Sequence, residues 1–176
     1  MAGSLVAESL PTVLSIDVFG VSVSDRLFAI VGLLVMLVLV GLSGFFSSSE
    51  IAMFAFPEHR LESVADGQAS GATLKRLKSD PHRLLVTILV GNNLVNIAMS
   101  SIATGILGYF MASQSRAVFV ATFGVTALVL LFGESAPKSY AIDNTESWAL
   151  RVARPLKLAE LALLPLVVVF DRLTRI

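Results

Sequence analysis

Three long stretches of this chain contain no Asp, Glu, Lys or Arg, and they limit its possible folds more than any other feature. They are Leu27–Ser49, Leu84–Ser115 and Ala117–Gly133. A helix needs about 20 mostly apolar residues to cross a bilayer. The first stretch has this length, the second implies a tilted or kinked helix, and the third is at the short limit. The sequence therefore predicts an all-α membrane protein with three spanning helices, at about residues 26–49, 81–113 and 116–133.

The composition agrees with a membrane location. Hydrophobic residues make up 55% of the chain, so the lipid bilayer is the expected partner. Because the formal net charge is zero, no basic surface indicates binding to nucleic acid. The sequence has no Cys, no HExxH motif, no pair of catalytic aspartates and no nucleophile–base pair, and we therefore do not expect an enzyme.

The 13 basic residues are distributed unevenly along the chain. Five lie between the first and second apolar stretches and six follow the third, against only Arg26 and Arg116 on the opposite side. Loops rich in Lys and Arg stay in the cytoplasm. We therefore expect a multi-pass protein of the cell membrane, with residues 1–24 as an extracytoplasmic tail and with a cytoplasmic linker and C-terminus.

The linker, residues 50–80, carries helix signals of its own. Pro57 can open a short helix that ends near Ala65, and Ala72–Lys78 predicts a second one, which together form a short helical hairpin. Asp80 directly before Pro81 predicts the N-cap and first residue of the second span.

The C-terminal segment, residues 143–176, predicts juxtamembrane helices. A start is expected at Asp143–Thr145, and Pro155 is expected to interrupt the helix. The apolar run Leu161–Phe170 is too short to span, so it is predicted to lie in the membrane surface as part of a belt.

Polar residues within the apolar stretches are costly and call for an explanation. The first stretch ends in GLSGFFSSSE, where Ser43, Ser47 and Glu50 share one helix face. The second contains ILVGNNLVNI, where Asn92 and Asn96 align and Asn93 is turned about 100° away. Hydrogen bonding between helices is the alternative explanation for these asparagines.

The third stretch ends in LLFGESAPKSYA. Pro137 predicts an extended conformation at Ala136 and a helix broken near Gly133, which frees backbone carbonyls next to the carboxylate of Glu134. Such carbonyls are tolerated at membrane depth where they line a cavity, and transporters use broken helices for cation sites. The alternative is a helix end at the interface, with Glu134 hydrated and Lys138 facing headgroups.

The three motifs together offer hydroxyl, amide, backbone and carboxylate oxygens. These hard ligands suit Mg²⁺ or another small hard cation, and not zinc or copper. The positions of the motifs along their spans predict a site in the inner half or middle of the bilayer, reached from the cytoplasm.

At SGFFSSSEIAMF, LLVTILVGNNLVNI and FGESAPKSYA, the sequence resembles the transmembrane domain of the CNNM/CorC family of magnesium transporters, over about residues 25–176. The resemblance implies three spans, a cytoplasmic helix pair, a belt helix, and a homodimer with an inward-open acidic cavity. It also implies export of Mg²⁺ from the cytoplasm by alternating access, coupled to Na⁺. Family members usually continue into a CBS-pair module that binds ATP; this chain stops at Ile176, so we do not expect ATP binding here.

Residue by residue, the resemblance implies the following metal ligands: the hydroxyls of Ser43 and Ser47, the amide oxygens of Asn92 and Asn96, the carbonyl of Gly133 and the carboxylate of Glu134. Three further residues would support the site: Glu50 at the cavity mouth, Pro137 at the helix break and Lys138 at the cytoplasmic end. The same ligands would also serve a Mg²⁺-sensing module that regulates partners without moving ions, and this alternative stays open.

Overall fold

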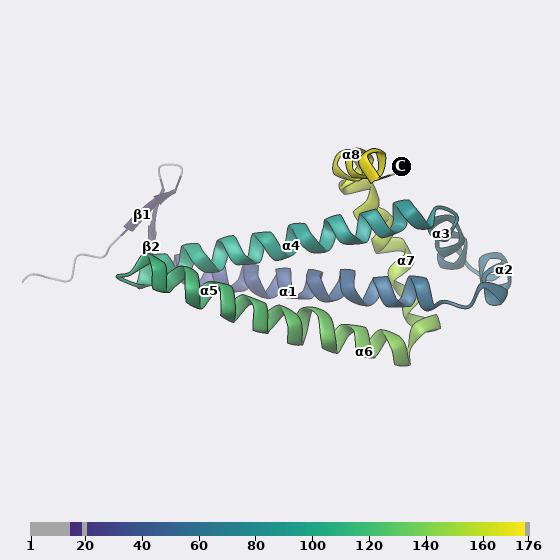
Figure 1. Ribbon diagram of the computed structural model, residues 1–176, viewed down its shortest axis with the longest axis horizontal. Coiled ribbons are helices and arrows are strands. Elements are labelled where there is room, and N and C mark those ends of the chain that lie inside the picture. The colour runs from purple at the N-terminus through teal and green to yellow at the C-terminus, as the bar shows by residue number, and fades with distance from the viewer. Residues whose placement is uncertain (1–14, 19–20, 175–176) are drawn as a thin grey trace, which may run out of the picture.

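Figure 1 shows the computed structural model, which describes residues 15–18 and 21–174, as three long helical rods lying side by side. The first rod is α1 (Asp25–Ala55), and the second is α4 (Pro81–Phe110). The third is made of α5 (Gln114–Leu128), the π-helix η1 (Val129–Ser135) and α6 (Ala136–Asp143). All three rods are long and apolar enough to cross a membrane. This confirms the prediction of an all-helical membrane fold with three spans.

Helix α1 extends further than predicted. Residues 27–40 are uncharged on all sides of the helix and mostly exposed, as expected for a surface that faces lipid. Beyond Ser49, where the span was expected to end, the helix continues to Ala55. Ala52 and Met53 are fully buried in this extension, so packing against other elements prolongs the helix past the apolar run.

The third rod changes helix type and is not unwound. Ala136 has helical dihedral angles (φ −65°, ψ −45°), so the extended conformation predicted there is wrong. The N–H of Ala136 donates to Leu131 O, five residues back, which is the π-helical spacing. The wider π turn places Pro137 at the start of α6, where a missing N–H is tolerated.

Two strands precede α1 near the turn between α4 and α5 (Figure 1). β1 (Ser15–Val18) and β2 (Val21–Ser24) pair antiparallel, with Ser15 opposite Ser24. This hairpin falls in the expected N-terminal tail and was not predicted from the sequence. Residues 1–14 of that tail lie outside the described residues.

At the other end of the rods, α2 (Glu58–Gly67) and α3 (Ala69–Lys78) form the expected helical hairpin. Lys75 donates a hydrogen bond to Glu62 across the hairpin, and this bond raises the pKa of Lys75 above its ordinary value. The predicted N-cap is present, because Asp80 accepts a hydrogen bond from the N–H of Arg83 at the start of α4.

Helix α7 (Thr145–Ala162) crosses the rods close to this hairpin, and α8 (Leu164–Thr174) lies beyond it against α4 (Figure 1). Pro155 sits inside α7 without ending it, so the predicted interruption is wrong. Because Pro155 has no N–H, the carbonyl of Arg151 loses its helical donor. Both residues are exposed, so a group outside the helix can hydrogen-bond to this carbonyl. Residues 175–176 of the expected belt lie outside the described residues.

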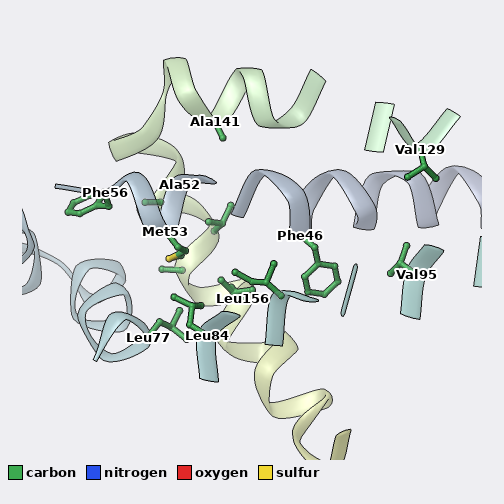
Figure 2. Packing of buried hydrophobic residues seen from close by; sticks show 14 of the residues in the cluster. Phe46, Ala52, Met53, Phe56, Leu77, Leu84, Val95, Val129, Ala141 and Leu156 are labelled. Atoms are coloured by element: carbon green, nitrogen blue, oxygen red, sulfur yellow. The ribbon is translucent and has the colours of Figure 1, made fainter. Parts of the chain in front are cut away.

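The core gathers where α7 crosses the bundle. Figure 2 shows Met53, Leu77, Leu84 and Leu156 pointing toward one another from four different helices. This core lies at the same end of the rods as α2 and α3. It fixes the position of α1 relative to α4 close to the serines of α1 and the asparagines of α4.

Close contact between α1 and α4 requires a glycine. A Cβ placed on Gly91 would lie 2.4 Å from the ring of Phe46, whereas one on Gly105 of the same helix meets no described atom within 4 Å. Phe46 is buried, so its ring has little room to move.

We therefore expect Gly91→Ala to destabilise the protein by about 1–3 kcal/mol, the usual cost of overpacking. Gly105→Ala is the matched control and should be neutral or slightly stabilising, because alanine favours the helix. Thermal unfolding in detergent measures both variants. Equal melting temperatures for Gly91→Ala and the wild type would contradict the described packing of α1 on α4.

Candidate functional site

The centre of the site lies where α1 meets α4. The Oγ of Ser43 is 3.2 Å from Oδ1 of Asn92 and 3.2 Å from Oδ1 of Asn96. A hydroxyl carries one hydrogen and can donate to only one of these two oxygens at a time. The two amide oxygens therefore compete for the one hydrogen of Ser43, and the three oxygens together offer more acceptors than this hydroxyl can satisfy. Asn93 lies away from the cluster, in a groove between α4 and α8, as its rotation about the helix predicted.

The serines that follow on α1 are buried as well. Ser47 and Ser49 are at most 1% exposed, and their hydroxyls have no hydrogen-bond partner among the described residues. Ser48 differs, because its hydroxyl donates to Phe45 O on the same helix. A buried hydroxyl without a partner is costly, so Ser47 has unused capacity to bind a ligand one turn from Ser43.

The third rod approaches the same part of α1. A Cβ on Gly133 would lie 2.7 Å from Ser43 Oγ, so the buried Gly133 is in close contact with the serine of the cluster. One residue further along α1, a Cβ on Gly44 would lie 3.0 Å from the ring of Pro137. These contacts bring α1, α4 and η1 together around Ser43.

Pro137 also affects the carbonyls of η1. It has no N–H, and the N–H of Ala136 is bonded to Leu131. Position 137 would donate to the carbonyl of Gly133 in an α-helix and to that of Phe132 in a π-helix. Because Pro137 cannot donate, both carbonyls lack this hydrogen bond. The Phe132 oxygen lies on the α1 side, 3.5 Å from a Cβ placed on Gly44. It was missed from the sequence; the signal that could have found it is its position five residues before the proline.

Glu134 lines a pocket of about 260 Å³ between α4 and the third rod. Asn96 lines the same pocket, so this amide connects the carboxylate with the Ser43 cluster. Neither Ser43 nor Ser47 is part of the pocket wall. The remaining polar residues of the wall are Ser100, Thr122 and Thr126, none of which was predicted from the sequence. Ser100 follows Asn96 by four residues, and this spacing on α4 could have identified it.

Glu50 and Lys138 form an ion pair with 3.1 Å between Oε2 and Nζ, each side chain about one third exposed. The pair links α1 to α6 on the α2–α3 side of the cluster. Glu50 also lines a separate pocket with Ile51, Phe54, Ala55 and Leu85. The two residues thus lie at the end of the site, outside the contact between Ser43 and the asparagines.

The donor set is mostly neutral. Within residues 15–18 and 21–174 no group of three or more His, Asp or Glu side chains could hold a metal ion. Any cation bound between these helices would meet hydroxyl, amide and carbonyl oxygens and the single carboxylate of Glu134. Such oxygens fit a hard cation, and the surplus of acceptors at Ser43 favours one over a neutral ligand.

Together these features define a multi-pass membrane protein with an oxygen-rich site between its spans. The chain belongs to the family of CNNM transmembrane domains: the family described as "Cyclin M transmembrane N-terminal domain" matches residues 34–176. This family includes CorC-type Mg²⁺ transporters, so the resemblance predicted from the three motifs is confirmed.

Individual relatives agree with this assignment. A chloroplastic DUF21 domain-containing protein of Arabidopsis thaliana is 35% identical over 136 residues, covering 75% of this chain and 20% of its own length. The UPF0053 inner membrane protein YfjD of Escherichia coli K12 is 34% identical over 135 residues, covering 76% of this chain and 31% of its own. A UPF0053 protein of Synechocystis is 29% identical over 143 residues, with shares of 80% and 40%. The chain thus spans less than half the length of these relatives.

The serines of α1 allow a direct test of the cluster. In a buffer free of divalent cations, Ser47→Ala should keep or raise the melting temperature, because it removes a buried hydroxyl without a partner. Ser43→Ala should lower it, with a loss of stability of about 1 kcal/mol, because the hydrogen that the two amide oxygens share is removed. Thermal unfolding in detergent separates the two, with Ser48→Ala as a control for the loss of a local hydrogen bond. A larger loss for Ser47→Ala than for Ser43→Ala would contradict the described hydrogen bonding.

Proposed function

We propose that this protein transports Mg²⁺ across the membrane, with Mg²⁺ as its substrate. The observation that carries the proposal is the acceptor-rich cluster of Ser43, Asn92 and Asn96, held against Gly133 between three spanning helices. A cation can balance acceptor oxygens that share too few hydrogens. Membership of a family that includes Mg²⁺ transporters supports the choice of ion.

The ligands of the ion in this proposal come from all three rods. Ser43 and Ser47 supply hydroxyls, Asn92 and Asn96 supply amide oxygens, and the third rod supplies the Gly133 carbonyl and the Glu134 carboxylate. Mg²⁺ requires octahedral coordination and gives up water reluctantly. One carboxylate neutralises half of its charge, so the affinity is modest and release is possible. The carbonyl of Phe132 lies on the same side and is a further candidate ligand.

Alternating access would need a joint in the third rod. The π-helical turn and Pro137 leave backbone groups without their regular partners, and such segments adjust at lower cost than a regular helix. The ion pair between Glu50 and Lys138 joins α1 to α6 beside this joint. In the proposed cycle this pair lies at the cytoplasmic end, and its rearrangement accompanies closure of the inward-facing cavity.

Orientation, coupling and assembly belong to the same proposal. The excess of Lys and Arg on the α2–α3 side favours a cytoplasmic location for that side, with β1 and β2 outside. Export would be driven by Na⁺. In transporters with broken helices, freed backbone carbonyls bind Na⁺, and the third rod offers carbonyl oxygens of this kind. The working unit would be a homodimer, as the family resemblance implies.

Substitution of the only carboxylate in the ligand set tests transport directly. In proteoliposomes with an internal Mg²⁺ indicator, Glu134→Gln should lower the flux at least tenfold, because the site loses its one negative charge. Glu62→Gln, on exposed α2, is the matched control and should leave flux unchanged. A Na⁺ gradient should change the rate of the wild type. A flux in Glu134→Gln equal to that of the wild type would contradict the proposed site.

The same vesicles distinguish transport from sensing. Binding of Mg²⁺ that depends on Glu134, without flux in either direction under any gradient, would indicate the sensor. Thermal stabilisation by Mg²⁺ measures this binding, since a ligand that binds only the folded state stabilises it.

A glycine pair tests the role of the third rod. A side chain at Gly133 would push against Ser43 Oγ, whereas at Gly124 of α5 a Cβ meets no described atom within 4 Å. We expect Gly133→Ala to reduce stabilisation by Mg²⁺ and Gly124→Ala to preserve it. Equal responses to Mg²⁺ in these two variants would remove Gly133 from the ligand set.

A further inference from the structure

A basic pocket lies away from the ion site, where α3, the start of α4 and α7 meet. It has a volume of about 380 Å³. Its wall contains three cationic side chains, Arg76, Arg83 and Lys157, and two carboxylates, Asp80 and Glu160. The proposed transport function uses none of these residues.

Both carboxylates are already engaged. Glu160 is buried, with 2.7 Å from its Oε1 to Arg83 Nε and 2.6 Å from its Oε2 to Lys157 Nζ. Asp80 caps α4 through the backbone N–H of Arg83. The Nε of Arg83 pairs with Glu160 by charge and forms no hydrogen bond among the described residues, and four N–H donors remain on its terminal nitrogens. Lys157 keeps two donors, and Arg76 adds a whole guanidinium. The pocket therefore keeps an excess of positive charge and of donors, which suits a phosphate group.

A separate apolar groove of about 420 Å³ lies further along α4. Helix α4 supplies Val86, Leu89, Val90, Asn93, Leu94 and Ile97 to this groove, and α8 supplies Leu166 and Phe170. Arg83, Val86, Val90, Asn93 and Ile97 follow one another at intervals of three and four residues, so they form one stripe on the helix. The arginine of the basic pocket stands at the head of the stripe that lines the groove.

The pocket and the groove lie on either side of the beginning of a membrane span. The spanning segment starts at Pro81, between Arg76 and Arg83, and its charge-free run begins at Leu84. Positive side chains at such a boundary lie at the level of the lipid phosphates, and the residues beyond it lie at the level of the acyl chains.

From this arrangement we infer that the protein binds an anionic phospholipid, with the phosphate in the pocket of Arg76, Arg83 and Lys157 and an acyl chain in the groove between α4 and α8. Basic pockets between helices at the membrane boundary bind anionic headgroups in this way. The lipid would hold α3, α7 and α8 against α4, because its two parts contact all of these elements.

The position of pocket and groove along one stripe of α4 favours a lipid over a free anion. Inorganic phosphate could bind the guanidinium groups but would leave the groove empty. A zwitterionic lipid could fill the groove, but its positive headgroup would face an excess of positive charge. Only an anionic lipid matches both parts. This inference does not rest on ion transport, and it stands or fails separately.

Retention of lipid by the purified chain provides the test. Native mass spectrometry in detergent should show bound phosphatidylglycerol, and this lipid should raise the melting temperature more than phosphatidylcholine or inorganic phosphate. Arg76→Gln should weaken the apparent affinity for phosphatidylglycerol about fivefold, the effect of one basic residue near an anionic surface. Arg76 is the first choice because it takes no part in the bridges to buried Glu160, which maintain the fold.

Two further variants make the result decisive. Arg116→Gln, an exposed arginine at the start of α5, is the matched control and should retain the wild-type affinity. Val90→Phe narrows the groove and should weaken lipid binding while the charged pocket remains intact. Equal retention of phosphatidylcholine, equal stabilisation by inorganic phosphate, or equal losses in Arg76→Gln and Arg116→Gln would each overturn the inference.

Discussion

The close approach of three helix backbones is the constraint on which the rest of this structure depends. Within a bilayer, association of helices gains little from burying apolar surface, because lipid tails are as apolar as leucine. Contact therefore rests on small residues that allow tight packing. Gly91 accommodates the ring of Phe46, and Gly133 meets the hydroxyl of Ser43. Larger side chains at either glycine would separate the rods and with them the oxygens of the site.

That close packing encloses groups that a stable membrane bundle would avoid. The hydroxyl of Ser47 is buried without a partner in the described part of the chain, and the oxygens of Asn92 and Asn96 compete for one hydrogen. Unsatisfied polar groups weaken a fold, and they occur in proteins mainly where function requires them. A bound cation, as proposed above, would give Ser47 a partner that interhelical hydrogen bonding does not supply.

The sequence predicted what depends on local pattern. Charge-free runs located the three spans, and Asp80 and Pro81 marked the start of α4. Helical spacing placed Asn92 and Asn96 on one face of α4, which lies against Ser43 in the structure, and turned Asn93 away. Features that depend on tertiary contact were missed. The extension of α1 to Ala55 requires the core around Met53, which no local pattern of α1 records.

The proline in the third span shows why such contacts decide the details. From sequence, Pro137 predicted an unwound break, since it lacks an N–H and restricts its predecessor. The ring of Pro137 packs against Gly44, so α6 stays in close contact with α1. The helix accommodates the missing donor by widening into a π turn. The turn preserves the rod while changing which carbonyls lack donors. Phe132 therefore joins Gly133, which the sequence had already suggested, as a candidate ligand, and the unwinding that the proline alone suggested is not needed.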